Sequence, residues 1–177
     1  QEVVAAIKAL GSDAVAVLGD CADTADSGRV FKAALDTFGD VNVLVNNAGF
    51  TRDKTLYGMT DDEFDSVVRV HLRGHFVNTR NAAQYWREKS RAGPVYGRLV
   101  STASEAMLYA TPGQPNYGPA KAGIVSLAIG YHRGHAAFPS TEVTEARTEP
   151  VEQGRAADGS LLDPEIKPAH PVVEVTR

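Results

Sequence analysis

The sequence has few of the residue types that specialised proteins depend on. Cys21 is the one cysteine among 177 residues, so no disulfide can form within the chain and a reducing cytoplasmic location is expected. No apolar run approaches the about 20 residues of a membrane-spanning helix, so no membrane association is expected. The net charge is −4, which argues against a nucleic-acid partner because such partners usually require a basic patch.

The first ten residues, QEVVAAIKAL, lack an initiating methionine and the features of a signal peptide. They contain no basic segment and no small-residue cleavage site. Their apolar spacing is instead typical of an amphipathic helix, and no N-cap residue precedes it. We therefore interpret the chain as beginning inside a longer protein.

Strand-like and helix-like segments alternate over residues 1–130. Short apolar runs predict strands buried on both faces, whereas apolar residues at helical spacing predict helices that begin at capping residues and end at glycines. The predicted strands are 14–18, 41–45 and 99–102, and the predicted helices are 2–10, 24–38, 61–90 and 115–129. This alternation indicates an α/β fold with a parallel, doubly wound sheet.

The composition changes near residue 131. The segment 131–177 contains five of the nine prolines, and its stretch TEVTEARTEPVEQGRAADG has almost no large apolar residues. Such a stretch cannot bury enough apolar surface to offset the entropy lost on ordering. We predict one domain over residues 1–130, followed by a disordered or irregular tail over residues 131–177.

Tyr117 and Lys121 are four residues apart in a predicted helix, so their side chains share one face. A phenol ordinarily titrates at about 10. An ammonium about 5 Å away, at an effective dielectric constant of about 20, favours the phenolate by about 3 kcal/mol. The pair can therefore exchange protons with a substrate. Alternatively, it is one of the many tyrosine–lysine pairs of exposed helices.

Two further groups follow predicted strands, where open α/β sheets bind their ligands. Ser104 follows the third strand, and its hydroxyl can hydrogen-bond a substrate oxygen as charge develops on it. The segment Asn46-Asn47-Ala48-Gly49 ends the second strand, and its small side chains let a flat ring approach the backbone. The alternatives are a serine that bonds the local backbone and an ordinary turn.

In combination, Asn46-Asn47-Ala48-Gly49, Ser104 and Tyr117-x-x-x-Lys121 resemble the short-chain dehydrogenase/reductase family. The stretch NNAGFTRDKTLYGMT is similar to 3-oxoacyl-[acyl-carrier-protein] reductases. The stretches RVHLRGHF, STAS and GQPNYGPAKAG are similar to the (3R)-hydroxyacyl-CoA dehydrogenase domain of multifunctional enzymes. The resemblance implies a Rossmann-like fold and a homodimer or homotetramer. It also implies NAD- or NADP-dependent hydride transfer to or from a carbonyl or alcohol, with a 3-oxoacyl or 3-hydroxyacyl thioester of fatty-acid metabolism as the substrate.

The same resemblance assigns roles to single residues. It implies that Tyr117 passes the proton to or from the substrate oxygen, that Lys121 assists Tyr117 and binds the nicotinamide ribose, and that Ser104 orients the carbonyl. The implied cofactor contacts are Asp20 at the adenine, with Asn47, Ala48 and Gly49 near the ribose. Asp20 can alternatively form the turn at the end of its strand.

His71 stands where the family usually has an asparagine that helps build a proton relay. A neutral imidazole both donates and accepts, so the relay can persist with histidine. The alternative is a buried histidine bonded to the backbone. His75 lies four residues later, but the sequence has no His-Glu-x-x-His motif and no further ligand cluster, so we expect no metal site.

Several family features have no match in the sequence. The Thr-Gly-x-x-x-Gly-x-Gly turn that binds pyrophosphate is missing, as are the two strands beside it and the residue that selects NAD or NADP. We therefore expect a partial Rossmann-like sheet with an exposed apolar edge, and weak binding of either cofactor. The alternative functions are an inactive fragment that acts as an interaction module through helices 61–90 and 115–130, and a gene product that folds poorly.

Overall fold

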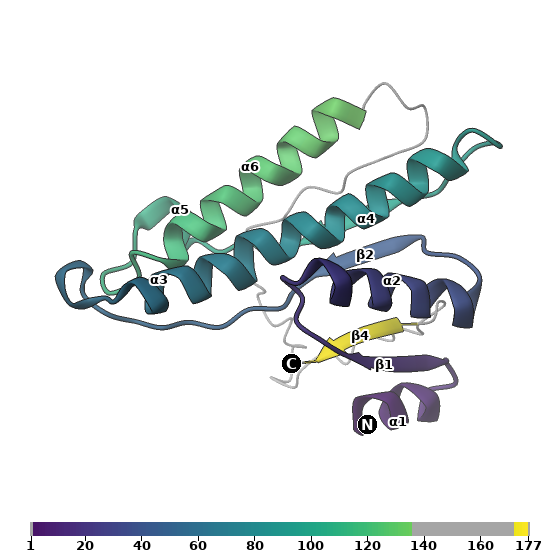
Figure 1. Cartoon of the computed structure of the whole chain (residues 1–177), viewed down its shortest axis with the longest axis horizontal. Coiled ribbons are helices and arrows are strands. Elements are labelled where there is room, and N and C mark those ends of the chain that lie inside the picture. The colour runs from purple at the N-terminus through teal and green to yellow at the C-terminus, as the bar shows by residue number, and fades with distance from the viewer. Residues whose placement is uncertain (1, 136–171, 177) are drawn as a thin grey trace, which may run out of the picture.

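The computed structural model describes residues 2–135 and 172–176. Helices and strands alternate as the sequence predicts, with two short 3₁₀ and π-helical turns, η1 and η2, between them (Figure 1). In chain order the elements are α1 (Glu2–Ala9), β1 (Ala14–Leu18), α2 (Thr24–Phe38), β2 (Val43–Asn46), η1 (Leu56–Gly58), α3 (Asp61–Val68), η2 (Arg69–Arg73), α4 (Gly74–Lys89), β3 (Arg98–Ser101), α5 (Ala106–Tyr109), α6 (Tyr117–His135) and β4 (Val172–Thr176).

All described strand pairs are parallel, which confirms the predicted sheet type. The strands form two separate pairs, β1 with β4 and β2 with β3. In the second pair Asn46 lies opposite Ser101, so the segments that follow these two residues leave the sheet side by side. The pair β2–β3 therefore brings the Asn46–Gly49 motif close to the segment that carries Ser104.

The expectation that the strands are buried on both faces is wrong for the described residues. Leu18 is 70% exposed and Val45 is 58% exposed, whereas Leu99 is 3% exposed. Successive side chains of a strand point to opposite faces, and α4 packs against β2 on one of them. Apolar side chains are therefore exposed on a face of the sheet, where Val45 and Val100 lie opposite each other in register.

Helices α3 and α4 form one continuous helical rod, as predicted for residues 61–90. The rod begins at Thr60 in a reciprocal capping box with Glu63. The π-helical turn η2 interrupts it at Arg69–Arg73, and the sequence did not predict this turn. Figure 1 shows α6 running beside the rod, and α6 contacts both α3 and η2. This packing brings Tyr117 and Lys121 of α6 toward His71 of η2.

Two described segments fall within the tail predicted for residues 131–177. Helix α6 continues to His135, five residues past the predicted domain boundary at residue 130, and Val172–Thr176 form β4. These two segments have regular structure, because α6 propagates without a break and β4 obtains backbone partners along all of β1. Residues 136–171 lie outside the described part of the chain, so the prediction of disorder stays a prediction there.

Candidate active site

Thr102, directly after β3, bonds two of the three motifs that the sequence singles out and lies two residues before Ser104 of the third. Lys121 is 3% exposed, and its Nζ donates a hydrogen bond of 2.6 Å to the carbonyl oxygen of Thr102. The hydroxyl of Thr102 donates to Oδ1 of Asn47 at 2.8 Å. Burial lowers the pKa of Lys121 because it disfavours the charged form. The hydrogen bond to the Thr102 carbonyl satisfies one N–H of the ammonium and holds it in place. From the sequence, Thr102 is expected only as the last residue of the strand 99–102, and its place two residues before Ser104 was the available signal of a role.

Tyr117 is half-buried at the start of α6. Its ring packs edge-on against the ring of His71, with the centroids 5.1 Å apart. The Nζ of Lys121 lies 5.4 Å from the centroid of the Tyr117 ring. The predicted proximity of phenol and ammonium is therefore confirmed, and His71 adds a second titratable group beside the phenol.

The backbone of Phe50 fixes the ring of His71 from the side opposite α6. The Nε2 atom lies 2.8 Å from the carbonyl oxygen of Phe50 and 3.2 Å from its nitrogen. A single nitrogen cannot donate to the first and accept from the second at once, so the tautomer decides which bond forms. Nδ1 is buried without a partner among the described residues. Burial, more than the nearby Lys121 charge, lowers the pKa of His71, while the Phe50 bond opposes this.

Gly49 provides the space that the His71 ring occupies. A Cβ atom at Gly49 would lie 2.1 Å from Cε1 of His71 and 2.8 Å from its Nδ1. Real atoms do not approach this closely, so glycine at this position allows the loop to pack flat on the imidazole. The alternative of a buried histidine bonded to the backbone is therefore met by the geometry, whereas the relay role of His71 stays a prediction.

Ser104 begins the turn that leads into α5. Its Oγ accepts a hydrogen bond of 3.3 Å from the backbone N–H of Ala106, and its carbonyl oxygen accepts one of 3.2 Å from Met107. The side chain is half-buried. The geometry is that of a serine bonded to the local backbone, and the oxygen retains a second lone pair and its own proton for a ligand.

Asp20 lies at the end of β1, and the structure does not place it in the Tyr117–Lys121 group. Its carboxylate accepts a hydrogen bond of 2.8 Å from the backbone N–H of Ala22 and pairs with Arg69 at 2.5 Å. The turn-forming alternative is therefore met by the geometry. Arg69 and His71 belong to the same π-helical turn, so η2 contacts both the β1 end and the β2 end of the site.

The described residues fit one half of a nicotinamide dinucleotide. The segment 47–49 is exposed at the end of β2, and the Lys121 ammonium has N–H groups beyond the one bonded to Thr102, as ribose hydroxyls require. The pyrophosphate half finds no cradle among the described residues. Asp23 caps α2, and acidic residues fill the first turn of α3 (Asp61–Glu63), so both helix starts repel phosphate.

Comparisons with known proteins identify the family of the chain. The family model described as short chain dehydrogenase matches residues 1–138. The chain belongs to the short-chain dehydrogenase family. In the part of the chain that the structure describes, no helix is long and apolar enough to span a membrane.

Relatives of the chain include enzymes of hydroxyacyl-CoA chemistry. The chain is 49% identical over 131 residues to hydroxyacyl-CoA dehydrogenase ChsB1 of Mycobacterium tuberculosis, covering 72% of this chain and 41% of that protein. It is 41% identical over 127 residues to peroxisomal multifunctional enzyme type 2 of Mus musculus, covering 71% of this chain and 16% of that protein. A short chain dehydrogenase from Mycobacterium avium has a similar crystal structure, with a TM-score of 0.76 and 42% identity over 80% of this chain and 50% of that one. The chain thus spans half or less of the length of these relatives.

Proposed function

We propose that this chain provides the reaction centre of an NAD(P)-dependent oxidoreductase that interconverts a 3-oxoacyl and a 3-hydroxyacyl thioester. The observation that carries the proposal is the placement of the Tyr117 phenol beside the Lys121 ammonium and the His71 imidazole, next to the exposed segment 47–49. The substrate class is supported by the name of the relative hydroxyacyl-CoA dehydrogenase, and it makes the substrate a small molecule.

In this proposal Tyr117 and Ser104 act on the substrate oxygen, and Lys121 acts on Tyr117. Tyr117 donates its phenolic proton to the carbonyl oxygen in reduction and removes the proton from the alcohol in oxidation. Lys121, held by the Thr102 carbonyl at 2.6 Å, stabilises the negative charge that develops on the phenol oxygen. Ser104 keeps its proton and donates a hydrogen bond from its hydroxyl to the same substrate oxygen. A bound nicotinamide supplies or accepts the hydride.

The cofactor contacts follow from the half-site that the described residues form. The backbone of Asn47, Ala48 and Gly49 lines the nicotinamide, and Lys121 donates to the ribose hydroxyls. Asp20 contributes at the adenine only if its carboxylate exchanges or shares its bond to Arg69. Because no pyrophosphate cradle is present among the described residues, we expect NADH and NADPH to bind weakly and with little preference.

Assembly and location belong to the same proposal. We infer a homodimer or homotetramer from the family resemblance. A cytoplasmic location remains a prediction from the single cysteine, and some relatives of the chain are named as peroxisomal enzymes. The similarity to 3-oxoacyl-[acyl-carrier-protein] reductases leaves a carrier-protein thioester as a second form of the substrate.

Replacement of Tyr117 by phenylalanine tests the proposal. The assay follows the oxidation of NADH or NADPH at millimolar concentration with a 3-oxoacyl-CoA, because weak cofactor binding is expected. Tyr117→Phe removes the transferable proton and should abolish turnover while the far-ultraviolet circular dichroism stays unchanged. Tyr57→Phe is the matched control, because Tyr57 is 93% exposed on η1. Turnover that survives in Tyr117→Phe would refute the assignment.

A further inference from the structure

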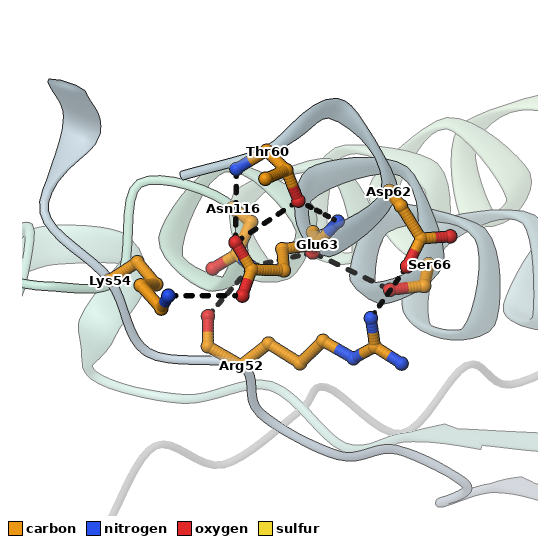
Figure 2. Close-up of polar contacts among 7 residues, drawn as sticks. All are labelled: Arg52, Lys54, Thr60, Asp62, Glu63, Ser66 and Asn116. Carbon is orange, nitrogen blue, oxygen red and sulfur yellow. Dashed lines mark hydrogen bonds and ion pairs between the residues drawn. The ribbon is translucent and has the colours of Figure 1, made fainter. Parts of the chain in front are cut away.

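The residue before Tyr117 makes an unusually complete set of hydrogen bonds. Asn116 is 0% exposed. Its Nδ2 donates to the carbonyl oxygens of Arg52 at 3.1 Å and Glu63 at 3.0 Å, and its Oδ1 accepts from the backbone N–H of Tyr117 at 2.7 Å. Figure 2 shows the Asn116 amide enclosed between the Arg52 segment and the first turn of α3. Both amide N–H groups and the amide oxygen are therefore used inside the protein.

These three bonds join three separate parts of the chain. Arg52 belongs to the loop that follows Asn46–Gly49, Glu63 to the first turn of α3, and Tyr117 to the first turn of α6. The backbone carbonyl of Asn116 also accepts the N–H of Ala120 at 3.2 Å, so the residue is the N-cap of α6. Its side chain accordingly satisfies one of the N–H groups that every helix start leaves free.

The asparagine side chain matches this position chemically. A carboxamide offers two N–H donors and one carbonyl acceptor, and the position presents two backbone carbonyls and one backbone N–H. Aspartate has the same shape, but its carboxylate would face the oxygens of Arg52 and Glu63 without a proton to donate. Serine keeps an acceptor near the Tyr117 N–H and loses the second donor.

Asn116 bonds the backbone of Tyr117, and the ring of Tyr117 reaches from that backbone to His71. The Tyr117 ring packs on His71, which is itself bonded to Phe50 of the same post-β2 loop. Asn116 thus fixes the α6 end of this contact, and Phe50 fixes the η2 end. Loss of either anchor lets the two rings shift relative to each other.

We propose that Asn116 is a positioning residue that holds the Tyr117 phenol in register with His71 and Lys121. The proposal rests on the proposed function, in which Tyr117 transfers the proton. Asn116 touches no substrate and acts only through Tyr117. It couples the first turn of α6 to the loop after β2, so a displacement of that loop is transmitted to the reacting group.

Three variants of the full chain test the proposal. Asn116→Asp removes both donors at constant shape, and Asn116→Ser is the second variant in case a buried carboxylate prevents folding. Gln114→Ala is the matched control: it breaks the bond of 3.1 Å from Nε2 of Gln114 to Asp53, a tie between the same two segments that does not involve Tyr117. Unfolding free energies are measured for each variant, so that loss of stability is separated from loss of position.

The first readout is independent of activity. Nuclear magnetic resonance measures amide exchange at Tyr117 and the contact between its ring protons and those of His71. Both variants keep an acceptor for the Tyr117 N–H but lose donors that hold this acceptor in place, so we expect faster exchange and loss of the ring contact in both, with neither change in Gln114→Ala. Unchanged exchange and ring contact in a folded Asn116 variant would overturn the proposal.

The second readout is the division of the effect between kcat and KM. A displacement of a reacting group by about 1 Å lowers the rate about a hundredfold, so we expect this fall in kcat with KM for the thioester changed less than about threefold. A variant that loses stability but keeps kcat in its folded fraction would show a purely structural role and refute positioning. Turnover that persists in Tyr117→Phe would refute the proposed function instead. The resonance measurements would then still test whether Asn116 positions the Tyr117 ring.

Discussion

Replacement of Gly49 by alanine gives the sharpest test of the packing around His71. A Cβ at this position would lie 2.1 Å from Cε1 of His71, whereas carbon atoms in contact are about 3.5–4.0 Å apart. A gap of about 1.5 Å must therefore open. His71 is 3% exposed and its Nε2 bonds Phe50, so the ring has no free space into which it can turn.

The cost of Gly49→Ala can be worked out from these contacts. Overpacking of a filled interior costs about 1–3 kcal/mol, and loss of the His71–Phe50 bond adds about 1 kcal/mol. We expect the free energy of unfolding to fall by about 2–4 kcal/mol in urea denaturation. Gly28→Ala is the matched control, because a Cβ at Gly28 in α2 meets nothing within 4 Å. Helix propensity predicts that this control gains up to about 1 kcal/mol.

A double-mutant cycle identifies the clash as the cause. His71→Ala removes the ring, so Gly49→Ala should cost less in that background, with a coupling energy of about 1–3 kcal/mol. The reasoning is refuted if Gly49→Ala alone stays within about 0.5 kcal/mol of wild type. It is also refuted if the two substitutions are additive.

The pH dependence of stability provides two further predictions. Burial lowers the pKa of His75 to about 4, below the 6.5 of an exposed histidine, so its neutral form stabilises the fold above pH 6.5. This stability is lost as the pH falls toward 4, by up to about 3 kcal/mol. In His75→Gln, the free energy of unfolding measured in urea should no longer fall with pH over this range. An unchanged dependence on pH would contradict the assignment. Hydrogen bonds from Lys89, then Tyr85, lower the pKa of Asp40 to about 2. Stability from this carboxylate is therefore present above about pH 4 and lost as the pH falls to 2. Asp40→Asn should make the free energy of unfolding depend less on pH below about 4. An equally steep dependence in the variant would refute this prediction.

Much of the fold follows from local signals. Helices were expected to begin at capping residues and end at glycines. Asp23 caps α2, Gly39 ends it in the left-handed conformation, and Thr60 begins α3 through a capping box. These capping interactions act within one turn of helix, so they can be predicted from the sequence alone. The extra turn η2, the extension of α6 to His135 and strand β4 were not predicted, because they depend on partners from other elements.

The sequence predicted which motif residues form the candidate site, but not the contacts between them. The spacing of Tyr117 and Lys121 and the Asn46–Gly49 motif identified the family, and the family model confirms this. From the sequence, His71 had two interpretations, and neither Thr102 nor Asn116 was assigned a role. The bonds of these residues cross the chain: Lys121 to Thr102 spans 19 positions and Asn116 to Arg52 spans 64.

By itself, the sequence determined the alternation of helices and strands, the parallel sheet type and the membership in the short-chain dehydrogenase family, because periodicity, caps and motif spacing are properties of neighbouring residues. Only the tertiary structure decided that Gly49 receives the His71 ring, that the Thr102 carbonyl holds Lys121, and that Asn116 ties Tyr117 to the loop after β2. Such contacts depend on where α6 and η2 cross the ends of β2 and β3, and local chemistry does not encode that crossing.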